Sequence, residues 1–394
     1  MVDTNEIRLI RELSLIPTAT FYEDLVQRKV IEELSAPNLE VEKDEFGNVI
    51  SVYKGDKSIS KSVNMAFVVH SDHPAFHLTE LANGKLLANT MGGLNKDISI
   101  GSTLDLHCAE GGIFSAKGKI IEEVDIGAGN PTGRFIVEVE GDPRGVKFGT
   151  LALDPMSIDN KVIRAGVLDD FAGIAMVIEA QKQIARAEIP VNIYTVFHRA
   201  EEVGFIGAYG VASKTPFPKS TFVFSIETSS IIAKRKRTDK ESQIIAKLGE
   251  GIILREGDGT TPGYDSETIS LMRVAGLEMG KSRVQKQRMY GGSCEASLYY
   301  AMGYRAAGLC LPLSAWHNNG DLEGTHKNIR EGVHIDDLAN GVLHLVTMAR
   351  MLGADKDLYK SLGDHDITPE HVKLVESRKK AFAGYLQQGF MKGL

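Results

Sequence analysis

The fold of this chain is organised around residues 191–204, VNIYTVFHRAEEVG. The first half of this stretch is rich in β-branched and aromatic residues and predicts a strand over residues 191–197. Two adjacent carboxylates, Glu201 and Glu202, follow where the backbone leaves the predicted sheet. Taken alone, such a pair is more often a solvated acidic turn than a functional site. The alternative is that one carboxylate binds a metal while the other moves protons, and it requires metal-binding residue types after the other strands as well.

Three other apolar runs lead to residues that can bind a metal. They are residues 64–69 before His70, residues 221–226 before Glu227 and residues 306–312 shortly before His317. Alternating helix and strand patterns after residue 160 predict βαβ units. We therefore expect an α/β fold with a mixed, mostly parallel central sheet flanked by helices. Because ligands bind at the carboxyl edge of such sheets, these side chains can converge on one pocket.

The middle of the chain differs from the rest in composition and in its secondary-structure patterns. Over residues 76–160 glycines are frequent, the predicted strands are short, and helical periodicity is missing. This predicts a small β-rich domain inserted into the larger α/β domain, which then comprises residues 1–75 and 161–394. Two helices are expected within residues 5–35, a hairpin over residues 39–53, and a terminal helix beginning at Thr368-Pro369.

Composition excludes several classes of protein. The 394 residues carry a net charge of -7, which argues against a nucleic-acid partner. No apolar run approaches the ~20 residues of a membrane span, and the start lacks a signal-peptide pattern. Only three cysteines occur, without C-x-x-C spacing, which suits a reducing compartment. We expect a soluble cytoplasmic protein.

The residue types after the predicted strands fit a site for two divalent metals, since imidazole and carboxylate ligands suit zinc and similar ions. Asp169, in the loop before a predicted helix, can bridge the two ions. His70 and Glu227 would hold one ion, while Glu202 and His317 would hold the other. Each of these residues also has an ordinary interpretation as a loop histidine or a helix-capping acid.

Two further carboxylates complete the predicted site. Glu201 is left free beside a metal-bound water, where it can act as general base and later protonate the leaving amine. Asp72 lies two residues after His70 and, on an extended backbone, can accept the second imidazole N–H.

Five short segments together identify a resemblance. In chain order they are Val69–Asp72 (VHSD), Val167–Asp170 (VLDD), Glu201–Gly204 (EEVG), Ser225–Glu227 (SIE) and Trp316-His317. They resemble the motifs of di-metal aminopeptidases of the glutamyl aminopeptidase and tetrahedral aminopeptidase family, within the zinc-exopeptidase clan. The resemblance covers most of the chain.

The resemblance implies a peptidase domain in two pieces and an inserted β-barrel-like domain that builds dimers or larger homo-oligomers. It implies two divalent ions, usually zinc, with cobalt or manganese as alternatives. The metal ligands implied are His70, Asp169, Glu202, Glu227 and His317. Glu201 is implied as the base and Asp72 as a partner that supports a metal ligand.

The chain departs from the family pattern at several positions. His73-Pro74-Ala75 replaces Glu-Ile-Gly after the His-x-Asp motif, and Glu227 stands where an Asp is usual. Residues 292–296, GSCEA, replace Gly-Thr-Asp-Ala, and residues 17–20, PTAT, replace an early Pro-Gly-x-Ser-Gly turn. His73, His77, Cys294 and Glu295 either reshape the substrate pocket or are neutral changes around an intact site.

The function expected is metal-dependent hydrolysis of an amide bond, with removal of N-terminal residues from peptides as the main hypothesis. A carboxypeptidase or an N-acyl amino acid deacylase of the same clan is the second. A non-catalytic metal-binding assembly protein on the peptidase fold is the third. The free base Glu201 argues against the third, because a binding protein does not need one.

Overall fold

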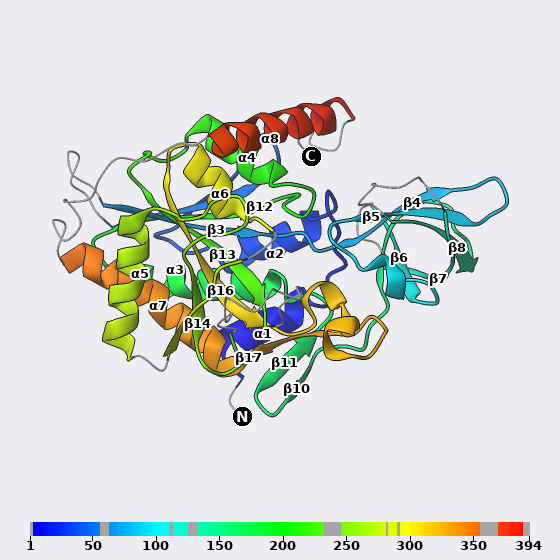
Figure 1. Cartoon of the computed structure of the whole chain (residues 1–394), viewed down its shortest axis with the longest axis horizontal. Helices are drawn as coiled ribbons and strands as arrows, with labels where there is room; N and C mark the ends of the chain where they lie inside the picture. Colours follow the sequence, from blue (N-terminus) through cyan, green and yellow to red (C-terminus); the bar gives the residue numbers. More distant parts are fainter. Residues whose placement is uncertain are drawn as a thin grey trace, which may run out of the picture.

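The computed structural model describes residues 3–55, 63–109, 113–124, 133–231, 246–280, 283–289, 292–354 and 369–388. It consists of a large α/β body and a closed six-stranded barrel at one end of that body (Figure 1). The prediction of an α/β fold with a mixed, mostly parallel sheet and a barrel-like insertion is confirmed.

The body is built on an eight-stranded sheet of order β1-β2-β12-β3-β13-β16-β14-β15. Its strands are β1 Glu40–Lys43, β2 Val49–Lys54, β3 Asn64–His70, β12 Asn192–His198, β13 Phe222–Ser230, β14 Ile252–Arg255, β15 Val284–Lys286 and β16 Arg305–Leu313. The four central strands β12, β3, β13 and β16 are parallel to one another. Their carboxyl ends therefore lie along one edge of the sheet.

Helices cover both faces of this sheet (Figure 1). They are α1 Asn5–Leu13, α2 Asp24–Glu33, α3 Phe171–Arg186, α4 Ile206–Lys214, α5 Ser266–Met279, α6 Glu295–Ala301, α7 Ile335–Ala354 and α8 Pro369–Gln387. Side chains of β3 alternate between two cores: Phe67 packs with α1, α2, α3, α5 and α7, while Val68 packs with α4, α6 and α8. None of the helices in these ranges is both long enough and apolar enough to cross a membrane.

The barrel has the order β4-β5-β8-β7-β6-β9 and its own apolar core. Its strands are β4 Ala75–Glu80, β5 Leu86–Met91, β6 Thr103–Cys108, β7 Ile113–Glu123, β8 Arg134–Glu140 and β9 Val146–Leu151. A separate three-stranded sheet joins β10 Ser157–Asp159, β11 Val162–Ala165 and β17 Glu331–His334. The division of the chain into segments 1–75, 76–160 and 161–394 stays a prediction.

Most elements expected from the sequence occur close to their predicted positions, including both N-terminal helices and the β1–β2 hairpin. Strand β13 is longer than predicted because it pairs with β16 as far as Ser230 and Leu313. Glu227 therefore lies inside the strand, where the sequence had suggested that it follows the strand. Helix α8 begins near its predicted start, but the expected cap Thr368 lies outside the described residues.

Candidate active site

The side chains predicted to bind metals meet at the carboxyl edge of the parallel strands. Three groups each place one ligand atom per residue within 4.8 Å of the others. These groups are His70 with Asp169 and Glu227, His70 with Glu201 and Glu202, and Asp169 with Glu202 and His317. His70 is the last residue of β3, Glu201 and Glu202 follow β12, Glu227 lies within β13, and His317 lies in the 3-10 turn η3 (Trp316–Asn318) after β16. The sheet therefore brings together residues from five separate segments.

Asp169 lies at the centre of this group. Its Oδ1 is 3.5 Å from Nε2 of His70, and its Oδ2 is 3.4 Å from Nε2 of His317. Nε2 of His317 also lies 3.2 Å from Oε1 of Glu202. Oδ1 of Asp169 and Oε1 of Glu227 are buried and lack a hydrogen-bond partner among the described residues. Buried carboxylate oxygens without hydrogen bonds, facing imidazole nitrogens, are donors that suit a metal ion.

The electrostatics of the site follow from burying several carboxylates together. Burial raises the pKa of Glu201 well above its usual range, and the charges of Glu227 and Glu202 raise it further. Burial likewise raises the pKa of Glu227 to about 8. For Asp169 burial acts in the same direction, but the nearby imidazoles of His317 and His70 hold its pKa well below the usual range. The site thus concentrates negative charge, and a cation would relieve the repulsion.

Both histidines are oriented by backbone carbonyls. Nδ1 of His70 lies 3.0 Å from the carbonyl oxygen of Asp72, and Nδ1 of His317 lies 3.1 Å from the carbonyl oxygen of Gly93. A proton on Nδ1 leaves Nε2 free for a metal, which is the usual arrangement for ligand histidines. Gly93 follows strand β5, so the barrel segment contributes directly to the site.

The carboxylate of Asp72 has a different position from the one expected. Its Oδ1 is 3.7 Å from Nδ1 of His70, which exceeds a hydrogen-bond distance. It accepts instead the backbone N–H of Glu201 at 3.0 Å and of Glu202 at 3.2 Å, and the hydroxyl of Thr20 donates to it at 2.8 Å. Asp72 therefore fixes the turn that carries the two glutamates.

A family model described as M42 glutamyl aminopeptidase matches residues 47–328. The chain belongs to this family. We therefore class it as a metallo-aminopeptidase, a hydrolase. A sequence search of curated proteins gave no match.

Solved structures of aminopeptidases share the fold. The TET1 peptidase of Pyrococcus horikoshii is 19% identical, with 87% of this chain and 99% of that one aligned at a TM-score of 0.69. Aminopeptidase APDkam598 of Desulfurococcus kamchatkensis is 18% identical over 91% and 98% of the two chains, with a TM-score of 0.73. The TET aminopeptidase of Thaumarchaeota archaeon SCGC AB-539-E09 is 17% identical over 95% and 98%, with a TM-score of 0.71.

Sequence analysis missed one carboxylate that lies beside the predicted metal-binding side chains. Glu331, the first residue of β17, is fully buried. Its Oε2 accepts the N–H groups of Leu168 at 2.7 Å and Asp169 at 3.0 Å, and its Oε1 accepts the N–H of His317 at 2.9 Å. Glu331 therefore ties together two segments that carry metal-binding side chains. No local pattern marks it, because its partners are 14 to 163 residues away in sequence.

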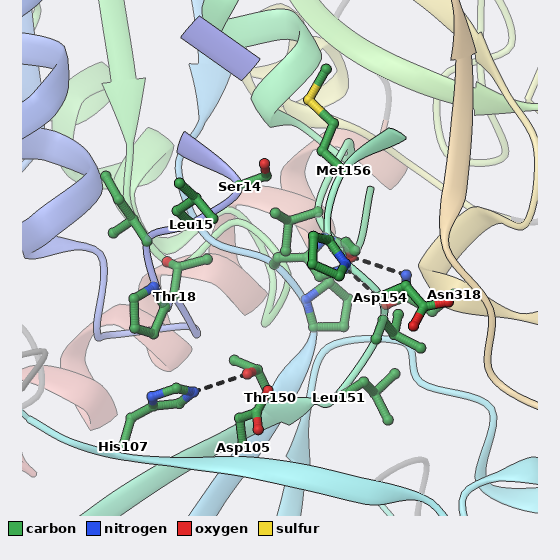
Figure 2. A pocket seen from close by; sticks show the side chains of 18 residues that line it. Ser14, Leu15, Thr18, Asp105, His107, Thr150, Leu151, Asp154, Met156 and Asn318 are labelled. Carbon is green, nitrogen blue, oxygen red and sulfur yellow. Dashed lines mark hydrogen bonds between the residues drawn. The ribbon is translucent and has the colours of Figure 1, made fainter. Parts of the chain in front are cut away.

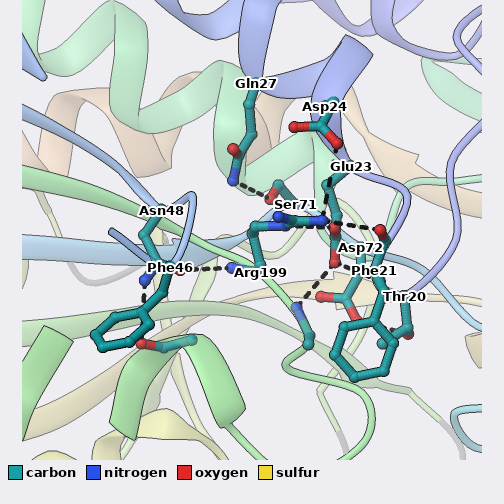
Figure 3. Close-up of polar contacts among 12 residues, drawn as sticks. Thr20, Phe21, Glu23, Asp24, Gln27, Phe46, Asn48, Ser71, Asp72 and Arg199 are labelled. Carbon is teal, nitrogen blue, oxygen red and sulfur yellow. Dashed lines mark hydrogen bonds and ion pairs between the residues drawn. The ribbon is translucent and has the colours of Figure 1, made fainter. Parts of the chain in front are cut away.

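The N-terminal segment contacts the chain just before the Glu201–Glu202 turn, where Figure 3 shows Phe21 and Glu23 beside Arg199. Arg199 is almost fully buried, and its Nε donates to Oε2 of Glu23 at 2.7 Å. Its Nη2 donates to the carbonyl of Phe21 at 2.8 Å. The other oxygen of Glu23 accepts the N–H of Ala200 at 3.0 Å. This buried ion pair fixes the backbone immediately before the Glu201–Glu202 turn, and sequence analysis did not foresee it.

The residues that depart from the family pattern take up different places. His73 lies directly behind Asp169, with Nδ1 2.5 Å from the Asp169 carbonyl oxygen and Nε2 3.2 Å from Oδ1 of Asn318. Nδ1 of His198 is 2.7 Å from Oε1 of Glu295, and both side chains are fully buried. His73 and Glu295 thus lie within the framework that surrounds the site.

The remaining two departures are Cys294 and His77. Sγ of Cys294 is 3.3 Å from the hydroxyl of Tyr264, and the Cys294 thiol has a pKa raised to about 11 by burial. His77 is in barrel strand β4, and its ring lies 6.3 Å from that of Tyr22. A role for any of the four in the substrate pocket stays a prediction.

A cavity of about 210 Å³ borders the site on the barrel side (Figure 2). Its walls come from residues 14–18, from barrel strands β6 and β9, and from His73 and Asn318. At its barrel wall, Nε2 of His107 lies 3.0 Å from the hydroxyl of Thr150, and burial lowers the pKa of His107 to about 4. Of these lining residues, His73 also contacts the carbonyl oxygen of Asp169.

Proposed function

We propose that the chain is a two-metal aminopeptidase that removes N-terminal residues from peptides. The observation that carries this proposal is the position of Asp169, whose two oxygens face Nε2 of His70 at 3.5 Å and Nε2 of His317 at 3.4 Å. A carboxylate whose two oxygens face different histidines would be shared by both ions of a two-metal site. His70 and Glu227 would complete one metal site, and Glu202 and His317 the other. Zinc suits this ligand set, with cobalt and manganese as alternatives.

Bound ions would supply polarisation of the scissile carbonyl and a water that is nucleophilic at neutral pH. Glu201 is the protein group that moves the proton, since it belongs to the same cluster and its raised pKa suits a general base. It accepts the proton of the attacking water and returns it to the leaving amine. Asp72 holds Glu201 in place by accepting its backbone N–H.

The charge of the site supports cleavage at the amino terminus of a peptide. Glu201, Glu202, Glu227 and Asp169 crowd one buried edge of the sheet. Two divalent ions would offset the charges of the carboxylates that hold them, and the remaining carboxylate of Glu201 would attract the ammonium group of a peptide N-terminus. The family model supports the same choice. A carboxypeptidase or N-acyl amino acid deacylase is the alternative within the clan.

The variant Glu201→Gln tests the proposal. It should bind zinc with unchanged stoichiometry, measured by plasma mass spectrometry, while turnover of aminoacyl 4-nitroanilides falls about 10²- to 10⁴-fold. Wild-type turnover in this variant would remove Glu201 from the mechanism. Faster cleavage of N-acyl amino acids or of C-terminal residues by the wild type would favour the alternative activities. No turnover of any amide substrate by metal-loaded protein would favour the non-catalytic interpretation.

A homo-oligomer, a peptide substrate and a cytoplasmic location complete the proposal, without a nucleic-acid or membrane partner. Support for assembly comes from the P. horikoshii TET1 peptidase, which can assemble into a tetrahedron or a large octahedral shell. Light scattering of the purified protein would distinguish a dimer from a larger assembly.

A further inference from the structure

Helix α8 carries a cation in the middle of an otherwise apolar face. Leu374, Arg378, Ala381, Phe382 and Tyr385 follow one another at intervals that place them on the same side of a helix. Leu374 is buried in the core beneath α4 and α6, while Ala381, Phe382 and Tyr385 pack against the cluster that contains Ala200. Helix α8 lies beyond residues 47–328, so membership in the family does not by itself predict it.

Aromatic contacts fix the rotation of this helix. The ring of Phe382 is 4.8 Å from that of Phe46, and the ring of Tyr385 is 4.7 Å from that of Phe21. Both contacts lie one or two turns beyond Arg378 on the same face. The packing of the helix therefore places Arg378 next to the loop that follows Glu201 and Glu202.

Arg378 packs against that loop. Its guanidinium carbon is 4.8 Å from the centre of the Phe205 ring. A Cβ atom placed on Gly204 would be 3.1 Å from Nη1 of Arg378 and 3.3 Å from its Cζ, so the guanidinium packs closely against the backbone of this loop. Burial lowers the pKa of Arg378, and the negative charge of Glu201 acts in the opposite direction. The cation is thus a close electrostatic neighbour of the base.

Among the described residues Arg378 has no counter-ion in contact with it. Its Nε is buried and has no hydrogen-bond partner there. Placing a guanidinium in a partly desolvated position without a partner costs free energy. Beside an active site, such a group is a candidate for ligand binding.

We propose that Arg378 binds a carboxylate of the peptide substrate on the leaving-group side of the scissile bond. The side follows from the chemistry, because Glu201 must protonate the leaving amine and Arg378 lies beside the loop that carries Glu201. A guanidinium holds a carboxylate through two parallel hydrogen bonds. The carboxylate is either the C-terminus of a dipeptide or tripeptide or an acidic side chain after the scissile bond. This inference rests on the proposed aminopeptidase activity.

Cleavage of three peptides by the metal-loaded protein tests this inference. All three begin with the same residue X, which is the N-terminal residue preferred in a screen of aminoacyl anilides. They are X-Gly-Gly, its C-terminal amide, and X-Asp-Gly amide. We expect the wild type to prefer X-Gly-Gly over its amide, mainly through KM. The variant Arg378→Gln should lower kcat/KM for X-Gly-Gly by about 10- to 100-fold and remove the preference. Lys380→Gln, an exposed change on the same helix, should keep it.

The arms of the experiment separate the sources of the carboxylate. Rapid cleavage of X-Asp-Gly amide that depends on Arg378 assigns the acidic side chain, whereas preference for X-Gly-Gly alone assigns the C-terminus. Equal cleavage of all three peptides by the wild type, or an unchanged preference in Arg378→Gln, would overturn the inference. Calorimetry that compares the binding of glycylglycine with that of glycylglycinamide tests Arg378 without requiring cleavage. A complete absence of cleavage would contradict the proposed function and not the role of Arg378.

Discussion

The substitution Glu331→Gln is expected to weaken one of the two proposed metal positions more than the other. Glu331 accepts two N–H groups from Leu168 and Asp169 through Oε2, and one from His317 through Oε1. A glutamine side chain has one oxygen and one NH₂ group in place of the two carboxylate oxygens. The NH₂ group is a donor, so it cannot accept a hydrogen bond from the backbone N–H that it then faces. The amide oxygen should stay on the Leu168 and Asp169 side, because the opposite orientation loses two hydrogen bonds. The N–H of His317 is then left without an acceptor.

The size of the effect follows from that single loss. A hydrogen bond to a charged group contributes about 1.5–3 kcal/mol, and 1.4 kcal/mol corresponds to a factor of ten. We therefore expect a loss of about 10- to 100-fold in affinity at the position formed by Glu202 and His317. The position formed by His70 and Glu227 should change by less than threefold, a limit of about 0.6 kcal/mol.

Competition with a chromophoric zinc chelator measures the zinc affinity of each of the two metal positions, and it does not depend on enzymatic activity. Asp337→Asn is the matched control, because Asp337 also accepts two N–H groups, from Gly249 and Gly251 at 2.7 Å each, but remote from the metal-binding group. It should reduce the free energy of unfolding without changing zinc affinity. Equal weakening of both positions by Glu331→Gln, or no weakening of either, would refute the assignment of Glu331 as a positioning residue for His317.

Three further predictions concern the supporting framework. Arg199→Met should lower the free energy of unfolding by about 3–5 kcal/mol in urea titrations, because it leaves Glu23 buried and unpaired; adding Glu23→Leu should recover part of the loss, and strict additivity would argue against the pairing. Gly93→Ala should weaken metal binding in the same chelator assay, since a Cβ there would lie 2.8 Å from Nδ1 of His317; unchanged binding would show that the barrel loop yields. Burial lowers the pKa of His344 from 6.5 to about 4, so stability should fall as the pH drops below 6.5. Between pH 7 and pH 5 the wild type should lose about 2 kcal/mol more than His344→Leu, and parallel pH profiles would contradict this.

Much of the site could be predicted because residue type and position after a strand carry the information locally. His70, Glu202 and His317 follow central parallel strands, and sheet topology alone places such positions at one edge. Asp169 was recognisable from the acidic pair before a strongly periodic helix. The barrel was visible in composition, although the limits of the inserted segment remain a prediction.

The tertiary structure alone decided how these side chains are held and which distant groups lie beside them. Glu331 acquires its role by packing against segments that approach it only in the folded chain. Arg199 and Glu23 form a pair across most of the N-terminal half, and Arg378 reaches Gly204 because aromatic contacts dock α8. Local sequence determines periodicity and ligand type, since both depend on neighbours along the backbone. Partners across the fold depend on the packing of distant segments, which no local pattern encodes.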